Sequence, residues 1–161
     1  NRALKMPFLQ DRALLKKRLL KGVETASSLP FVDSSLVAVL GFGFGGLCAL
    51  DIARSGIDIK GAISIYGHFD PPQKSGLKQI KAKILILHGF NDPISSLQEL
   101  LFFQEEMEHA QVEWQTHLYS NTFHAFATPS ANNPQAGILY NPLSAKRAWN
   151  ETKEFLKEVL F

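Results

Sequence analysis

Apolar residues recur along the chain at spacings that predict alternating helices and strands. Over residues 11–24, Leu15, Leu19 and Val23 share one face of a helix. Residues 36–40 form a short, continuous apolar run of the kind found in strands that are buried on both faces. Three further strands are predicted at residues 62–66, 84–87 and 112–118. The last of these alternates apolar and polar residues, which is typical of a strand nearer the edge of a sheet.

The segments between these strands predict helices. Residues 47–54 continue from a glycine-rich turn, and Ser96 with Glu99 forms a capping box that opens a helix to about His109. A final helix has its apolar face over residues 145–159. Apolar strands separated by helices indicate a sheet covered on both faces. We therefore predict an α/β fold with a doubly wound, mostly parallel sheet.

The glycine-rich turn over residues 41–46 allows two interpretations. One is a dinucleotide-binding fingerprint, in which Gly41, Gly43 and Gly46 and the following helix N-terminus hold a pyrophosphate. That fingerprint requires an acidic residue about 20 residues further on, at the tip of the second strand. Tyr66 stands in that neighbourhood instead. The absence counts against a nucleotide-binding domain, which remains the weaker alternative.

The other interpretation is a nucleophile elbow, in which a sharp turn between strand and helix raises one side chain above the sheet. In the elbow pattern G-x-Nu-x-G, the nucleophile position falls on Gly43. On this fold a catalytic triad runs along the chain in the order nucleophile, acid, histidine. Asp92 follows an apolar strand and His124 lies in a loop after the next strand. Both residues are therefore candidate triad members.

Four motifs, in order, resemble the dienelactone hydrolase (carboxymethylenebutenolidase-like) family of α/β-hydrolases. The hexapeptide at residues 41–46 is similar to that family's elbow, which carries cysteine in the third place. The other matching motifs are His88-Gly89-x-x-Asp92-Pro93 for the acid loop, His124-Ala125-Phe126 for the histidine loop, and Tyr140-Asn141 with Ala148-Trp149 for the closing pattern. The resemblance runs from about Asp33 to the end of the chain, and more weakly back to Asn1.

The resemblance implies a hydrolase that opens small lactones or esters through a covalent acyl-enzyme, without a cofactor or a metal. It implies Asp92 and His124 as the acid and the histidine, and the amide of Phe44 as half of an oxyanion hole. Two features depart from the family. Gly43 has no side chain that could attack a carbonyl, and the chain starts after the strands that supply the second oxyanion amide and the substrate-gripping residues. We therefore expect an inactive or impaired hydrolase, with a catalytically dead binding or regulatory module as the alternative.

Other reactive or aromatic residues are expected to have structural roles. Cys48, the only thiol, lies one turn past the elbow and is expected to be a small buried residue rather than a replacement nucleophile. His88 is expected to pack in its turn, and no histidine–carboxylate spacing predicts a metal site. Three histidines are expected to be ordinary surface or loop residues: His68, His109 and His117. Three phenylalanines are expected in the core or lining a pocket: Phe102, Phe103 and Phe126.

Composition narrows the class of protein further. The 161 residues (1–161), 45% hydrophobic and 20% charged, predict one packed domain. A net charge of +2 argues against a nucleic-acid partner. The basic residues 16–18 and Lys21 are expected on a solvated helix face, with a partner or anion site as the alternative. The single cysteine and the lack of a membrane-length apolar run or a signal peptide favour a cytoplasmic protein without a membrane partner. The sequence starts at Asn1, without a methionine and inside its pattern of apolar and polar positions, so we expect an N-terminal truncation. A homodimer is one way to complete the fold.

Overall fold

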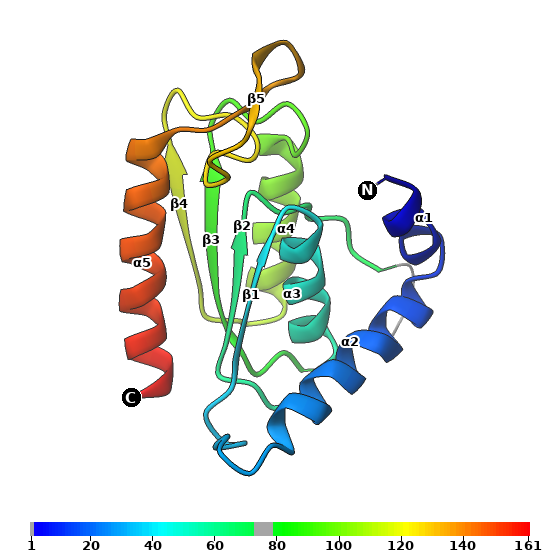
Figure 1. Cartoon of the computed structure of the whole chain (residues 1–161). Helices are drawn as coiled ribbons and strands as arrows, with labels where there is room; N and C mark the ends of the chain where they lie inside the picture. The colour runs from blue at the N-terminus through cyan, green and yellow to red at the C-terminus, as the bar shows by residue number, and fades with distance from the viewer. Residues whose placement is uncertain (1, 73–78) are drawn as a thin grey trace.

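A computed structural model describes residues 2–72 and 79–161. Four parallel strands form one sheet in the order β1-β2-β3-β4 (Figure 1). The strands are β1 (Ala38–Phe42), β2 (Gly61–Ile65), β3 (Lys83–Gly89) and β4 (Trp114–Tyr119). The predicted α/β class with a parallel sheet is confirmed, and β4 lies at the sheet edge, as its alternating pattern predicts.

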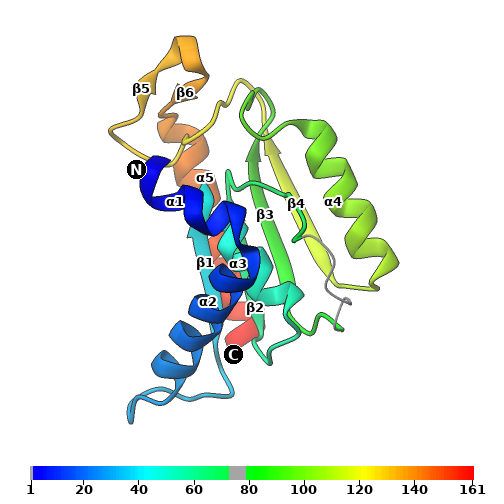
Figure 2. The same ribbon diagram turned by 90° about the vertical axis from the view of Figure 1, so that its right-hand side faces the viewer.

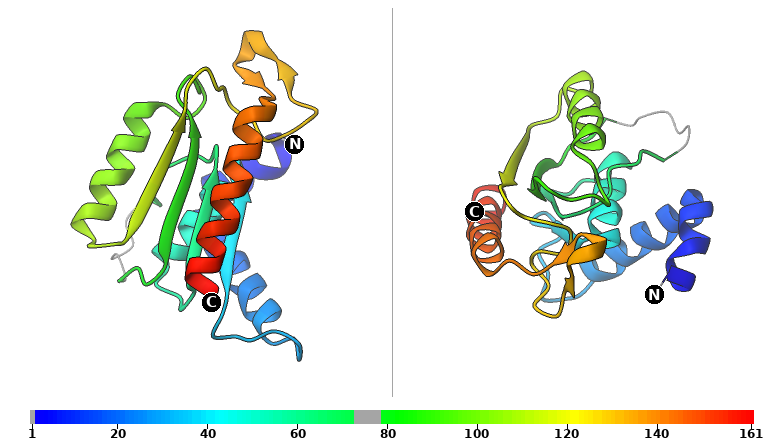
Figure 3. Two further views of the ribbon diagram at one scale, coloured as in Figure 1. Left: turned by 90° about the vertical axis from the view of Figure 1, so that its left-hand side faces the viewer. Right: turned by 90° about the horizontal axis from the view of Figure 1, so that it is seen from above.

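Helices cover both faces of the sheet (Figure 3). They are α2 (Arg12–Ser27), α3 (Phe44–Arg54), α4 (Leu97–His109) and α5 (Pro142–Leu160). The helices α3 and α4 lie on one face, with α2 outside α3, and α5 lies on the other. Alternate residues of β3 serve the two cores: Ile84 and Ile86 belong to the cluster that α3 and α4 cover, and Leu85 and Leu87 to the one that α5 covers.

The sequence signals at the helix starts have their expected geometry. The amide of Glu99 donates to Ser96 Oγ at 3.2 Å, and the Glu99 carboxylate accepts from the Ser96 amide, so the predicted capping box is confirmed. At the start of α2, the amide of Leu14 donates to Asp11 Oδ1 at 2.8 Å. Each contact satisfies backbone donors that the first turn of a helix leaves without an intrahelical partner.

The first part of the chain contains one helix that the sequence pattern did not predict, α1 (Arg2–Gln10). Figure 2 shows α1 and α2 in front of α3. The predicted inward face of α2 is confirmed at Leu15, which is buried in the core. Arg12 also fastens α2 to α3, because its guanidinium donates to both carboxylate oxygens of Asp51 at 2.7–2.9 Å.

The first strand departs from its prediction. The apolar run predicts a strand buried on both faces, but Leu40 and Phe42 are each 37% exposed. The reason is position: β1 ends the sheet, and no strand within residues 2–72 or 79–161 pairs with its outer edge. The strand has the sequence of a central strand and the environment of an edge strand.

A small antiparallel ribbon between β4 and α5 was also not predicted. It consists of β5 (Asn132–Asn133), a 3-10 helix η1 (Pro134–Ala136) and β6 (Ile138–Leu139). The ribbon lies above the carboxyl ends of the strands (Figure 1). Strands of two residues leave no periodic pattern in the sequence, which explains why the alternation of apolar residues did not reveal them.

Candidate active site

The glycine-rich turn forms a sharp strand-to-helix elbow at the carboxyl end of β1. Gly43, the N-cap of α3, has φ 53° and ψ −117°, a conformation that residues with a side chain rarely adopt. The amide of Gly43 donates to the Ile65 carbonyl of β2 at 3.0 Å, which ties the elbow to the sheet. A Cβ at Gly41 would collide with the Gly45 carbonyl, so the turn requires a glycine there. This is the backbone geometry of a nucleophile elbow.

A side chain at position 43 would project toward the candidate histidine. A Cβ built on Gly43 lies 3.8 Å from His124 Nε2 and 3.6 Å from Cε2 of Tyr66, which are ordinary contact distances. A hydroxyl or thiol on that Cβ would be within hydrogen-bonding reach of Nε2. The elbow therefore has space and direction for a nucleophile, although Gly43 supplies none.

Asp92 is held in the turn after β3 by three hydrogen bonds. Its Oδ1 accepts from the amides of Ile94 at 2.8 Å and Ser95 at 3.0 Å, and its Oδ2 accepts from Nδ1 of His124 at 2.8 Å. Burial alone would raise the pKa of the Asp92 carboxyl, but these hydrogen bonds outweigh burial and hold the pKa below its ordinary value. Asp92 is therefore an ionised acceptor at neutral pH.

This acceptor determines the tautomer of His124. A carboxylate can only accept, so Nδ1 carries the proton and the neutral ring leaves a lone pair on Nε2. The backbone of His124 is fixed by the unpredicted ribbon: its amide donates to the Gly137 carbonyl at 2.9 Å, and its carbonyl accepts from Leu139 at 3.1 Å. The structure thus brings together Gly43, Asp92 and His124, which the chain order had paired as candidates.

Two further side chains contact His124 and were missed as site residues by the sequence analysis. The ring of Tyr66 packs edge-on against the imidazole with 5.2 Å between centroids, and its hydroxyl bonds Thr128 Oγ1 at 2.7 Å. His68, predicted to be an ordinary histidine, stacks on His124 with 5.9 Å between centroids. Both follow the carboxyl end of β2. Their position after β2 could have identified them as site residues, because the side chains that follow neighbouring parallel strands lie close together at one edge of the sheet.

The predicted oxyanion donor lies beside the elbow. Phe44 is the first residue of α3, so its amide belongs to the orphan donors of a helix N-terminus. The amides of Gly46 and Leu47, by contrast, donate to the Gly43 carbonyl at 2.9 and 3.3 Å. The Phe44 amide fits one half of an oxyanion hole, which usually takes a second donor from another loop.

The remaining candidates stand apart from this chemistry. Burial raises the pKa of the Cys48 thiol to about 11, with Asp51 adding to the effect, so Cys48 is a poor nucleophile at neutral pH. His88 is buried as expected, and its Nε2 donates to the Ser95 carbonyl at 2.9 Å. Phe103 and Phe126 lie in the core as expected, but Phe102 is 59% exposed on α4, so that expectation was wrong.

Among the described residues, no group of three or more His, Cys, Asp or Glu side chains could hold a metal ion. No helix within those residues is long and apolar enough to cross a bilayer.

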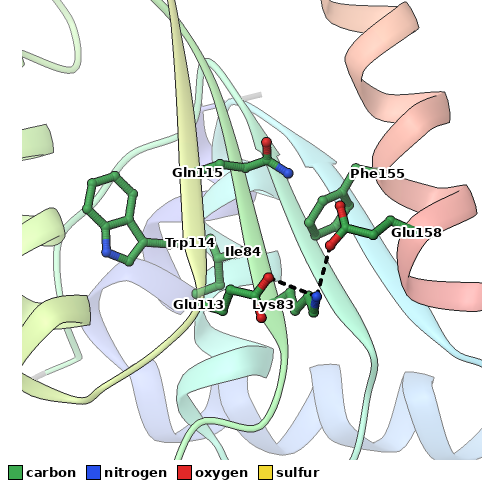
Figure 4. Close-up of a pocket in the computed structure, with 7 residues that line it drawn as sticks. All are labelled: Lys83, Ile84, Glu113, Trp114, Gln115, Phe155 and Glu158. Atoms are coloured by element: carbon green, nitrogen blue, oxygen red, sulfur yellow. Dashed lines mark hydrogen bonds and ion pairs between the residues drawn. The ribbon is translucent and has the colours of Figure 1, made fainter.

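A cavity of about 230 Å³ is lined by Lys83, whose ammonium bridges Glu113 and Glu158 at 2.8 Å each (Figure 4). Lys83 begins β3, so this cavity lies at the opposite end of the strands from Asp92 and His124.

A parallel sheet that carries a nucleophile elbow, a buried acid and a histidine in this order defines the α/β-hydrolase class. The model of the dienelactone hydrolase family matches residues 2–160. The chain belongs to the dienelactone hydrolase family.

The chain is also similar to individual proteins. An uncharacterised protein of Caenorhabditis elegans is 34% identical over 147 residues, which cover 89% of this chain and 93% of that protein. A Bradyrhizobium protein named as a probable 2-oxo-3-(5-oxofuran-2-ylidene)propanoate lactonase is 27% identical over 158 residues, covering 92% of this chain and 60% of its own length. A dienelactone hydrolase-like promiscuous phosphotriesterase from metagenomic libraries superposes with a TM-score of 0.92 at 26% identity, covering 99% of this chain and 67% of its own.

Proposed function

We propose that this chain carries a site for small lactones or esters of the dienelactone hydrolase type, with the acid and the histidine in place and no nucleophile. Its hydrolase activity is then impaired, because Gly43 has no side-chain atom that could attack the substrate carbonyl and form an acyl-enzyme. The observation that carries the proposal is the pairing of Asp92 and His124 at 2.8 Å beside an elbow with φ 53° at Gly43. A cytoplasmic location and a homodimer remain predictions.

The geometry supports specific roles in that chemistry. Asp92 orients the His124 ring and stabilises it when it gains a proton, and Nε2 removes the proton from an attacking group. The Phe44 amide stabilises the developing oxyanion. In the complete family arrangement, the attacking group is a thiol on the third residue of the elbow. In this chain, Nε2 of His124 faces Gly43, which has no side chain.

The test is to restore the nucleophile and to ask whether the histidine activates it. Gly43→Cys is mixed with p-nitrophenyl acetate, and the intact mass is followed over the first turnover. We expect one acetyl group per chain to form within the first turnover, because the new sulfur lies within reach of Nε2.

The matched control is the double variant Gly43→Cys with His124→Ala, which keeps the thiol and removes its activating base. We expect acylation of the double variant to slow by about 10²–10⁴-fold, the usual contribution of a general base. Equal rates in the single and double variants would contradict the proposed site.

The missing nucleophile also favours a second candidate, a binding or regulatory module that retains the hydrolase fold. The two candidates differ in turnover, since a binding module would hold a lactone or its hydroxy-acid product without converting it. Hydrolysis that depends on His124 supports the enzyme. Saturable binding of the lactone without hydrolysis supports the module.

A further inference from the structure

The site contains a general base whose acceptor atom faces a backbone without a side chain. His124 Nε2 lies 3.8 Å from where a Cβ of residue 43 would be, and the His124 side chain is 12% exposed. The lone pair on Nε2 therefore faces the place where a side chain of residue 43 would stand, which no atom of Gly43 fills. A general base in this position can act on any hydroxyl-bearing molecule that fits there, and water is the smallest.

Resting on the proposed function, we propose that the Asp92–His124 pair activates a water molecule above Gly43 for direct attack on the carbonyl of a small ester or lactone. The reaction is then a single displacement without an acyl-enzyme. A water oxygen in hydrogen bond with Nε2, at about 2.6–3.2 Å, stands close to where the missing nucleophilic atom would project. The chain would thus be a slow hydrolase with a different nucleophile, rather than a dead one.

The surroundings hold the imidazole in the orientation that this reaction needs. Asp92 fixes the Nδ1–H tautomer, and Tyr66 and His68 pack against two sides of the ring. Tyr66 is itself anchored through its hydroxyl to Thr128, and it has φ 40°, an uncommon value for a residue with a side chain. A ring held on three sides is preorganised to accept a proton along one direction, which is the direction of Gly43.

The reaction balances without an additional reactant. The water oxygen forms a bond to the carbonyl carbon while its proton passes to Nε2 of His124, and Asp92 stays ionised beside the imidazolium. The carbonyl oxygen takes up the negative charge, next to the Phe44 amide. The tetrahedral intermediate then expels the alkoxide, which takes the proton back from Nε2. An ester gives an acid and an alcohol, and a lactone gives one ring-opened hydroxy acid.

The chemistry favours substrates with a good leaving group. Without a covalent intermediate, water must attack a carbonyl that only one identified amide polarises. Enol-lactones and aryl esters expel a stabilised anion and need less help at this step. We therefore assign activated esters and enol-lactones, rather than alkyl esters or amides, as the substrate class.

The experiment measures hydrolysis of p-nitrophenyl acetate by the chain and by three single variants. We expect His124→Ala to lose about 10²–10⁴-fold in the rate above buffer. Gly43→Ala should lose at least about tenfold, because its methyl group takes the space of the water without providing a nucleophile. His109→Ala, which changes an exposed histidine on α4, should keep the full rate.

One readout separates a chemical role of His124 from a structural one. Added imidazole should restore part of the rate of His124→Ala, because it replaces the missing ring, but none of that of Gly43→Ala. A rate of His124→Ala that added imidazole leaves unchanged would overturn the assignment of the general base to His124.

The outcomes also distinguish this inference from the proposed function. If Gly43→Cys is acylated with help from His124 while the original chain shows no His124-dependent hydrolysis, the water mechanism is wrong and the proposed site stands. If neither reaction depends on His124, both are wrong. Hydrolysis by the original chain that survives in His124→Ala without added imidazole also overturns the water mechanism.

Discussion

At the scale of single residues, the proposed chemistry depends on Gly43, which has no side chain, and on Asp92 and His124, which are joined by a hydrogen bond of 2.8 Å. Gly43, Asp92 and His124 were predictable from chain order, because the elbow, the acid and the histidine follow successive strands in a fixed sequence on this fold. Tyr66 and His68 were not. Their contacts with His124 arise from the pairing of neighbouring strands, which no local pattern shows.

The buried histidine beside the site makes stability depend on pH. Burial lowers the pKa of His88 below its ordinary 6.5, although Asp92 at 4.0 Å acts in the opposite direction. The unfolded chain therefore binds a proton at this ring at a higher pH than the folded chain, so stability is lost as pH falls below about 6.5. We expect the free energy of unfolding, measured by urea denaturation, to decrease between pH 7 and pH 5.

The comparison variant is His88→Gln, which should show a shallower decrease over the same range. His68, whose pKa is also lowered by burial, keeps part of the slope in that variant. His109→Gln is the matched control at an exposed histidine and should retain the full slope. Identical slopes for His88→Gln and the original chain would show that His88 does not titrate as its burial indicates.

At the scale of helices and strands, periodic segments were predictable and short or unpaired ones were not. The pattern located four strands and the long helices, and Ser96 with Glu99 marked the start of α4. The helix α1 was missed, and so were the two-residue strands of the ribbon that fixes the His124 backbone. The β1 strand was predicted with the right residue types and the wrong surroundings. An apolar run indicates that a strand can be buried on both faces, but the neighbouring strands determine whether it is.

The ion pair between α2 and α3 gives a prediction at this scale. Asp51 has a side chain 3% exposed, and it balances Arg12 and the buried Arg54. Asp51→Ala removes the carboxylate from Arg12 and one of two carboxylates from Arg54, which keeps Glu106 at 2.6 Å. We therefore expect a loss of about 3 kcal/mol in the free energy of unfolding, at the lower end of the range for a broken buried pair. Denaturant titration measures this loss.

The control is Glu24→Ala, which removes the exposed pair with Lys21 and should change stability little. Similar effects for the two variants would show that Asp51 does not anchor α2.

At the scale of the whole molecule, the chain covers 67% of the length of the metagenomic phosphotriesterase. It also has an apolar strand, β1, at the edge of its sheet. Among the described residues, the Phe44 amide is the one donor that we propose for the oxyanion hole. Losing one such donor costs about 10²–10³-fold in rate in another hydrolase. We therefore expect a restored nucleophile to act with weaker stabilisation of the oxyanion than a site with two donors provides.

We expect Gly43→Cys to acylate but to turn over at least about 100-fold more slowly than the metagenomic relative on the same activated ester. Steady-state kcat values measured side by side give the answer. Equal values would mean that the single amide suffices or that a second copy of the chain completes the site. Sedimentation at the assay concentration separates these two explanations, since only the second requires a dimer.

The most direct test of the central claim, an intact acid–histidine pair without a nucleophile, is the intact mass of the unaltered chain during its reaction with p-nitrophenyl acetate. The account predicts one unmodified mass throughout, because neither Gly43 nor the weakly acidic Cys48 forms an acyl-enzyme. Stoichiometric acetylation that forms and decays with turnover would contradict it, and mapping that acetyl group to Cys48 would identify the thiol as the nucleophile.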